Sequence, residues 1–445
     1  MKLLLHLAIA AVAFVPTHAV RADISSRQIN DALSKLDASV IAWRRDIHQH
    51  PELSNREFRT SKLVAEHLRK LGLEVRTGIA HTGVVGVLRG GKPGRTVALR
   101  ADMDALPVVE EVDVPFRSTL TAEYLGKQVG VMHACGHDAH VAILMGVAEA
   151  LAGMRRDLPG TVLFIFQPAE EGAPDGEQGG AALMLEQGLF KEPRPQAIFG
   201  LHVVAGIPSG VIGYRSGPFM AAANSFQIRV TGRQTHGSQP WSGVDPIVAA
   251  AQIVMGLQTI VSRQLDITAL PAVVSVGKIE GGVRSNIIPD SVEMRGTIRT
   301  FDSRMREGIV ERMTRTVEAI AASSGATAHL TIDSASEPVL VNDPALSELV
   351  LPSLRRLVGP DRLKVISLQT GAEDFAYFAQ EVPGFYFFVG VTPPDTDVAN
   401  APTNHSPRFF IDEQALAVAT RALMTVAVNY LQGGSSHQNS VTPTR

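Results

Sequence analysis

The chain has 445 residues, of which 45% are hydrophobic, and its formal net charge is −3. This length is more than one simple core organises, so we expect two domains. The near-neutral charge and the lack of a polybasic tract argue against a nucleic-acid-binding protein.

The two ends of the chain are predicted to lie outside the fold. Lys2 supplies a positive charge, residues 3–15 form an apolar stretch too short to cross a bilayer, and Ala22 ends a small-residue cleavage site. We therefore expect residues 1–22 to be a signal peptide and the mature protein to be periplasmic or secreted, without membrane contact. The alternative is an uncleaved membrane anchor. Residues 433–445 are polar and rich in Gly and Ser, which predicts a disordered tail.

The first half of the mature chain alternates strands and helices, as an α/β domain does. Helices are predicted over 27–50, 57–71, 140–153 and 179–187, and strands over 84–89, 96–100, 161–166 and 197–203. The run at 161–166 is continuously apolar, which is typical of a buried parallel strand.

The middle of the chain has a different order. A strand at 225–231, a helix at 245–263, strands at 272–279 and 291–300, a helix at 304–323 and a strand at 328–332 predict the β-α-β-β-α-β order of a ferredoxin-like unit. Beyond Pro338 the first pattern resumes, with helices at 344–358 and 413–431 and a buried strand at 385–389. We therefore predict one domain in two parts, 23–213 and 334–432, with a smaller domain at 214–333 inserted between them.

The single cysteine, Cys135, lies in His-Ala-Cys-Gly-His-Asp-Ala-His at 133–140. A lone cysteine in an exported protein cannot form an internal disulfide, so we interpret it as a metal ligand. The alternative is a buried, inert thiol beside surface histidines.

Further candidate ligands lie at the ends of the predicted strands or in the loops after them: Asp102, Asp104, Glu170, Glu171 and His202. The carboxyl ends of parallel strands meet at one edge of a sheet, so we expect one shared site, although each residue alone could be a cap or a hydrogen-bonding partner. A thiolate with imidazoles and carboxylates suits zinc, manganese, cobalt or nickel, and the number of ligands fits two ions better than one. The Glu170–Glu171 pair is the discriminating feature, because one carboxylate can bind metal while the other takes a proton from water.

Seven stretches together resemble the amidohydrolase branch of the aminoacylase/carboxypeptidase metallopeptidases, which includes hippurate hydrolases and auxin-amino-acid hydrolases. They are 100–107, 133–140, 167–172, 200–203, 285–290, 371–375 and 404–406. The resemblance implies a mixed-sheet, phosphorylase/hydrolase-like catalytic domain with an inserted ferredoxin-like lid and dimerisation domain. It implies metal ligands at Cys135, His137, Glu171, His202 and His405, a general base at Glu170, and a carboxylate at Asp104 that supports the ligands. The resemblance gives no ligand role to three residues of the 133–140 motif, which we expect to support the ligands or to cap a helix: His133, Asp138 and His140.

For the lid, the resemblance implies that His236 contacts the scissile carbonyl, often from the partner subunit. Asn286 and Arg295 match positions that either bind the substrate carboxylate or order the lid. The common Gly-Gly-His-Ala-Ala run reads Gln-Thr-His-Gly-Ser here. Trp241 follows closely and is expected either to shape the acyl pocket or to pack within the lid.

The implied activity is hydrolysis of N-acyl amino acids to a carboxylic acid and an amino acid. The resemblance also implies two divalent metal ions per subunit and a homodimer or larger homo-oligomer formed through the lid. The alternatives are a carboxypeptidase or dipeptidase on the same scaffold, and a non-catalytic periplasmic binding protein. The presence of Glu170 argues against the binding protein, because ligand binding alone needs no base beside the metal.

Overall fold

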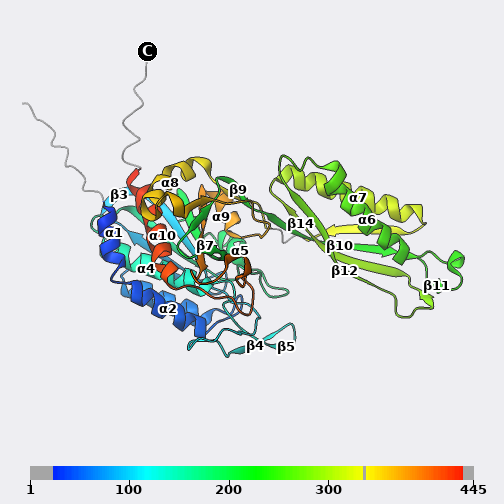
Figure 1. Ribbon diagram of the computed structural model, residues 1–445, viewed down its shortest axis with the longest axis horizontal. Coiled ribbons are helices and arrows are strands. Elements are labelled where there is room, and N and C mark those ends of the chain that lie inside the picture. The colour runs from blue at the N-terminus through cyan, green and yellow to red at the C-terminus, as the bar shows by residue number, and fades with distance from the viewer. Residues whose placement is uncertain (1–23, 334–336, 434–445) are drawn as a thin grey trace, which may run out of the picture.

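The structure is a computed structural model that describes residues 24–333 and 337–433. The predicted signal peptide at 1–22 lies outside the described residues, as does the predicted tail apart from Gly433, which ends the last helix. The described chain forms a large domain and an elongated lid that projects from it (Figure 1).

The large domain is built on a mixed sheet, as predicted, and this sheet has eight strands. Its strand order is β1 (Glu74–Ile79), β2 (Gly83–Arg89), β6 (Pro159–Gln167), β3 (Lys92–Asp102), β7 (Ala197–Pro208), β18 (Gly384–Thr392), β8 (Ile212–Tyr214) and β17 (Leu363–Val365). The central strands β6, β3, β7 and β18 run parallel, whereas β2 and β8 pair antiparallel with their inner neighbours. The carboxyl ends of the four parallel strands therefore lie at one edge.

Helices cover both faces of this sheet. On one face lie α1 (Ser26–Leu33), α2 (Asp37–Gln49), α3 (Phe58–Lys70), α4 (His137–Gly153), α8 (Pro344–Val358) and α10 (Gln414–Gly433). On the other face lie α5 (Gly180–Glu186) and α9 (Phe375–Glu381). Strand β6 alternates between the two cores, with Phe164 on one side and Ile165 on the other. Helix α4 is buried on nearly every side between β3, α2 and α10, which explains its apolar sequence.

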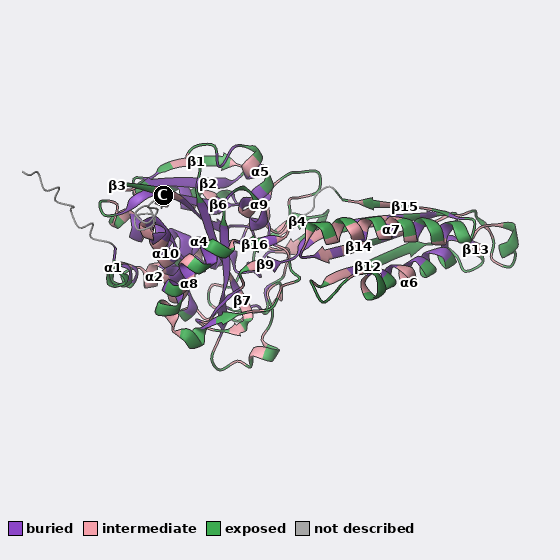
Figure 2. Cartoon of the chain, turned by 90° about the horizontal axis from the view of Figure 1, so that it is seen from above, coloured by how far each residue is buried: buried purple, intermediate pink, exposed green. Residues whose placement is uncertain are grey.

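The lid contains a four-stranded antiparallel sheet in the order β12 (Ala272–Gly281), β14 (Ser291–Thr300), β10 (Ala222–Thr231) and β15 (Thr327–Ile332). Helices α6 (Pro246–Gln264) and α7 (Ser303–Ser323) pack on it, and Figure 2 shows their outward sides exposed. The chain order β10-α6-β12-β14-α7-β15 is the one predicted, while the limits 214–333 of the inserted domain stay a prediction. Asp245 caps α6, and Pro246 occupies its first turn.

Among the described residues, one helix, α6, has the length and apolar content to cross a membrane. Its buried side, which includes Ile253, Leu257 and Ile260, belongs to the lid core. The lid's own packing therefore accounts for the apolar residues on this side of the helix.

The main departures from the predicted elements are small. The single helix expected over 27–50 is divided into α1 and α2 by a turn at 34–36, so that Leu33 and Val40 are both buried in the core. Several short strands were not predicted, among them β1 and the hairpin of β4 (Thr121–Tyr124) and β5 (Lys127–Gly130). Their sequences are mostly polar and short, which leaves little periodic signal.

Candidate metal centre

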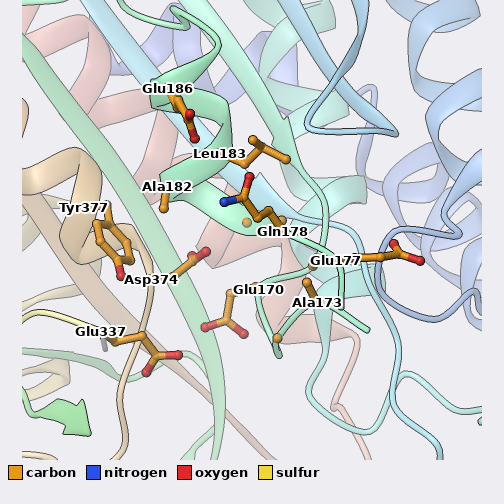
Figure 3. A pocket seen from close by; sticks show the side chains of 14 residues that line it. Glu170, Ala173, Glu177, Gln178, Ala182, Leu183, Glu186, Glu337, Asp374 and Tyr377 are labelled. Carbon is orange, nitrogen blue, oxygen red and sulfur yellow. The ribbon is translucent and has the colours of Figure 1, made fainter. Parts of the chain in front are cut away.

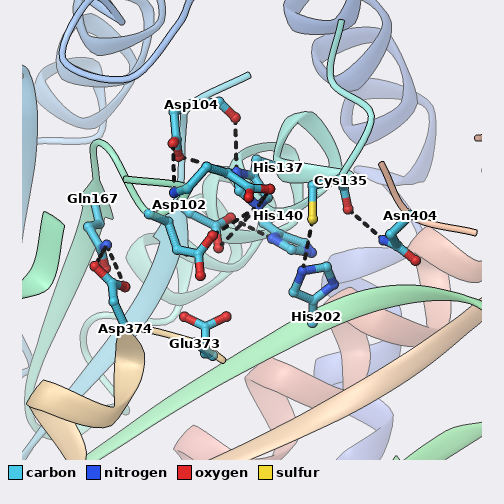
Figure 4. Close-up of polar contacts among 12 residues, drawn as sticks. Asp102, Asp104, Cys135, His137, His140, Gln167, His202, Glu373, Asp374 and Asn404 are labelled. Atoms are coloured by element: carbon cyan, nitrogen blue, oxygen red, sulfur yellow. Dashed lines mark hydrogen bonds and ion pairs between the residues drawn. The ribbon is translucent and has the colours of Figure 1, made fainter. Parts of the chain in front are cut away.

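The predicted ligands meet where the parallel strands of the large sheet end (Figure 4). Asp102 ends β3, Cys135 and His137 lie at the start of α4, and His202 lies on β7. The pair Glu170–Glu171 follows β6, and His405 comes from a loop after β18. A cavity of about 410 Å³ opens onto Cys135, Glu170, Glu171, His202 and His405.

The distances place these side chains in one cluster. Cys135 Sγ lies 3.3 Å from His202 Nε2 and 3.2 Å from His405 Nε2. Glu171 Oε1 lies 3.0 Å from His405 Nε2 and 4.0 Å from His137 Nε2. Cys135 belongs both to a group with His137 and His202 and to a group with Glu171 and His405, each with ligand atoms within 4.8 Å of one another. The thiol therefore lies between two sets of possible metal ligands.

The rings of His137 and His202 each direct the nitrogen that can bind a metal, Nε2, toward this cluster. His137 Nδ1 donates to the carbonyl oxygen of Asp104 at 2.9 Å, and His202 Nδ1 donates to that of Val203 at 2.8 Å. A carbonyl oxygen only accepts, so Nδ1 carries the proton and the lone pair of Nε2 faces the centre. His137 Nε2 is buried and has no hydrogen-bond partner among the described residues. An unsatisfied buried acceptor is costly, and a bound cation would satisfy it.

The electrostatics of the cluster also fit a cation. Burial, followed by the charges of Glu171 and Glu170, raises the pKa of the Cys135 thiol well above its usual range. Burial, followed by the charges of Glu373 and Glu171, raises the pKa of Glu170 in the same way. These shifts reflect an excess of buried negative groups, which a divalent cation would offset. The thiol, imidazoles and carboxylates present therefore fit a metal site, and their chemistry suits zinc or another transition metal.

Neighbouring groups hold the ligands in place. Asp104 Oδ2 accepts hydrogen bonds from the Glu171 backbone N–H at 3.0 Å and from Ser54 Oγ at 2.8 Å, so Asp104 supports Glu171 as well as His137. His405 adopts φ 70° and is anchored by its backbone N–H, which donates to the Ala134 carbonyl at 2.8 Å. A non-glycine residue in this region of φ is strained, and such strain is often found at functional sites.

Asn404, which precedes His405, joins three parts of the centre. Its Nδ2 donates to the carbonyl oxygens of Cys135 at 2.9 Å and Val203 at 3.0 Å. Its Oδ1 accepts from the Ala205 backbone N–H at 3.1 Å. The sequence analysis included Asn404 in a matched stretch without assigning it a role.

A buried ionic network lies directly beneath the centre. The fully buried Arg100 guanidinium contacts Asp102 at 2.7 Å and Glu373 and Asp374 at 2.9 Å each. Its Nε donates to Gln167 Oε1 at 2.8 Å. None of these roles was predicted. The available signal was the adjacent carboxylate pair 373–374 at the start of α9, which lies in a matched stretch.

Three histidine-motif residues left open by the sequence have supporting positions. His140 Nε2 accepts from the Val203 backbone N–H at 2.9 Å, and its Nδ1 contacts Asp102, so neither nitrogen is free for metal. Asp138 pairs with Arg44 at 2.7 Å and contacts His48 at 2.8 Å. His133 is buried, and burial lowers its pKa to about 3.

The lid residues named from the sequence do not lie at the metal cluster of their own chain. His236 is exposed on the short strand β11 (Thr235–His236), which lies at the lid end remote from the large domain (Figure 1). Its Nδ1 accepts from the Ser238 backbone N–H at 3.1 Å, which leaves Nε2 to carry the ring proton of the neutral form. The Asn286 carbonyl accepts from the Gly237 backbone N–H at 2.8 Å, beside His236.

Two further lid residues named from the sequence are exposed. Trp241 is 79% exposed, so the alternative that it packs within the lid of its own chain is wrong. Arg295 is exposed on β14, whereas Arg299, farther along the same strand, lines the cavity at the metal cluster. Arg299 was not named from the sequence.

A second, acidic cavity adjoins the centre through Glu170. It has a volume of about 610 Å³, and Glu177, Glu186, Glu337 and Asp374 lie around it (Figure 3). Glu170 and Glu337 line both this cavity and the one at the metal cluster.

Comparison with known proteins agrees with this arrangement. The family described as Peptidase family M20/M25/M40 matches residues 98–429. The chain is 42% identical to Thermostable carboxypeptidase 2 of Saccharolobus solfataricus over 92% of this chain and 99% of the relative. It is 37% identical to N-acetyl-L-cysteine deacetylase of Bacillus subtilis over 92% of each chain.

A solved structure from Bacillus subtilis, described as a dinuclear metal-binding peptidase from the M20 family, has a TM-score of 0.73 and 35% identity to this chain. It covers 90% of this chain and 99% of its own. The chain therefore belongs to peptidase family M20/M25/M40 and is a metal-dependent hydrolase of amide bonds.

Proposed function

We propose that the protein hydrolyses N-acyl amino acids to a carboxylic acid and a free amino acid. The observation that carries this proposal is Glu170, a carboxylate next to the ligand Glu171 that faces the cluster, with Oε2 3.8 Å from His137 Nε2. A second carboxylate at this position is suited to proton transfer rather than to ligation. The relative described as an N-acetyl-L-cysteine deacetylase supports an N-acyl amino acid as substrate.

The ligand set Cys135, His137, Glu171, His202 and His405 would hold two divalent ions, of zinc, manganese, cobalt or nickel. The Bacillus subtilis structure described as dinuclear supports the number two. Such ions, when bound, polarise a carbonyl oxygen and lower the pKa of water.

The chain's own residues would handle the proton and the substrate. Glu170 would take a proton from the attacking water and later give it to the departing amine nitrogen. Its buried position beside Glu373 favours its protonated form, which it needs for the second of these transfers. Arg299, at the wall of the same cavity, would bind the substrate carboxylate, because a guanidinium pairs with a carboxylate through two parallel hydrogen bonds.

His236 would stabilise the developing oxyanion of a partner subunit. Its Nε2–H is free to donate, since Ser238 engages Nδ1. The lid also offers a surface for a homodimer: Val248 and Met255 on α6 are exposed, and β12 is an edge strand that exposes Ile279. Exposed apolar groups beside an unpaired strand edge favour association with a second copy.

We also propose that the protein is exported to the periplasm or secreted. The basis is the sequence pattern of residues 1–22 alone. Mass determination of the mature protein from a secreting host tests this, because cleavage after Ala22 gives a defined new N-terminus.

A carboxypeptidase activity is the second candidate, supported by the 42% identity to Thermostable carboxypeptidase 2. A dipeptide resembles an N-acyl amino acid in which the acyl group carries an ammonium group. Steady-state kcat/KM values for N-acetyl and N-benzoyl amino acids, compared with dipeptides of the same C-terminal residue, separate the two candidates.

The Glu170→Gln variant tests the reaction itself. We expect it to retain the parent metal content and to lose about 10²–10⁴-fold in kcat, as expected when a general base is removed. The matched control is Glu186→Gln, because Glu186 lines the adjoining acidic cavity but is exposed and lies outside the metal cluster. Parent-like turnover of Glu170→Gln with full metal content would contradict the proposed role.

A further inference from the structure

A third cavity adjoins the metal cluster on the other side of the Glu170–Glu171 loop. It has a volume of about 360 Å³, within the range of roughly 300–1,000 Å³ typical of small-molecule sites. Glu171 lines both this cavity and the one that contains Arg299. A group that enters the third cavity therefore lies next to a predicted metal ligand.

The walls of this cavity combine apolar and charged side chains. Leu53, Leu106, Pro107, Leu125 and Pro174 contribute to them, together with the ring of Tyr124. Charged residues are also present: Arg56 and Glu177 form an ion pair at 2.5 Å, and Glu123 and Asp175 add two further carboxylates. The leucine and proline side chains nevertheless give the cavity an apolar wall that can contact an apolar group.

The tip of the β4–β5 hairpin provides the most informative observation. The hairpin has a two-residue loop, Leu125 and Gly126, with φ values of 50° and 74°. Both central residues of such a turn need positive φ, so Asn-Gly is the preferred sequence and leucine is strained. Leu125 is also 66% exposed, and the adjacent Tyr124 is 40% exposed. An exposed leucine in a strained conformation is unfavourable for the hairpin alone, which points to a role in contacting a ligand.

We infer that this cavity, with Leu125 and Tyr124 at its rim, binds the acyl group of the substrate and selects for apolar acyl groups, either aryl or linear alkyl. The inference rests on the proposed function. If Arg299 binds the carboxylate of the amino acid, the scissile carbonyl lies at the metal cluster between the two cavities. The acyl group then extends past Glu171 into the cavity at the β4–β5 hairpin.

The inference predicts how the rate depends on acyl length. Each methylene that the cavity buries should raise kcat/KM about four-fold, the equivalent of roughly 0.8 kcal/mol. N-hexanoyl and N-benzoyl amino acids should therefore be hydrolysed at least ten-fold more efficiently than the N-acetyl amino acid.

The Leu125→Asn variant tests the site without endangering the fold. It creates the favoured Asn-Gly turn, so we expect Tm to stay the same or rise. We expect the ratio of kcat/KM for N-hexanoyl to N-acetyl substrate to fall about ten-fold. The matched control is Leu120→Asn, because Leu120 is 43% exposed just before the same hairpin and does not line the cavity.

The outcomes separate this inference from the function on which it rests. An unchanged hexanoyl-to-acetyl ratio in Leu125→Asn, or an equal loss in Leu120→Asn, would overturn the acyl site and leave the proposed function intact. A parent enzyme that hydrolyses dipeptides but none of the N-acyl amino acids would overturn the proposed function, and this acyl site with it.

Discussion

Asn404 offers a test of how the metal centre is held together. Its side chain makes three hydrogen bonds: two to the carbonyls of Cys135 and Val203 and one from the backbone N–H of Ala205. Cys135 and His202 are thereby connected to the loop that carries His405. The change to consider is Asn404→Ala, which removes all three bonds and leaves the backbone of each ligand segment intact.

The expected magnitude follows from these contacts. A typical hydrogen bond contributes about 1 kcal/mol net, so the loss of three should lower the free energy of unfolding by about 3 kcal/mol. Groups that orient metal ligands also affect affinity directly, and their removal typically costs about 10–100-fold in metal binding. We expect Asn404→Ala to show both effects. Asn404→Asp should weaken metal binding as well, because a carboxylate cannot donate to the two carbonyl oxygens.

The assay is chelator competition for the metal, combined with urea denaturation. Cobalt-substituted protein adds a spectroscopic measurement, because the thiolate-to-cobalt absorption reports directly on the Cys135 bond. The control is Asn400→Ala, since Asn400 is exposed and bonds to the nearby Asp397. A loss of stability without any change in metal affinity or in the cobalt spectrum would refute the positioning role of Asn404.

Three further predictions concern other parts of the site. Cys135→Ser should lower metal occupancy and activity together, which metal analysis and activity assays measure. In the metal-loaded parent, Cys135 should resist thiol reagents until a chelator is added, which thiol titration measures. Arg100→Met should lower the free energy of unfolding by about 3–5 kcal/mol in urea titrations, because it leaves buried carboxylates without their cation. His236→Ala should lower kcat about 10²–10³-fold with little effect on KM. Mixing it with Glu170→Gln should restore part of the activity if His236 acts across a dimer.

The central strands of the large sheet could be predicted because they are apolar runs with clear ends, whereas the short outer strands β1, β8 and β17 were missed. Glu170, Glu171 and His202 could be placed at one edge for the same reason. His405 could not, because its loop carries no periodic signal and its position depends on the hydrogen bond to Ala134. It was found only through the family resemblance.

Buried charge was the least predictable feature. Arg100 directly follows the apolar run 97–99 of β3, and nothing in the sequence specifies that Glu373 and Asp374 approach it from the start of α9. The strand pattern also could not show which of the two arginines, Arg295 or Arg299, lines the cavity at the metal cluster. They lie on the same face of β14, four residues apart, which corresponds to about 13 Å along a strand. Only the distance from the large domain distinguishes them.

The length of the lid determines whether Arg299 and His236 of one chain can contact the same substrate. Arg299 lies near the end of β14 that lines the metal cavity, whereas β11 pairs with β13 (Ile287–Ile288), just before the opposite end of β14. The ten residues of β14 span roughly 30 Å at about 3.4 Å per residue. Because the lid sheet is one packed unit, Arg299 and His236 of the same chain cannot both reach one substrate unless the lid itself unfolds. If both contact the substrate, Arg299 must serve the site of its own chain and His236 that of a partner, so two copies are needed to complete each site.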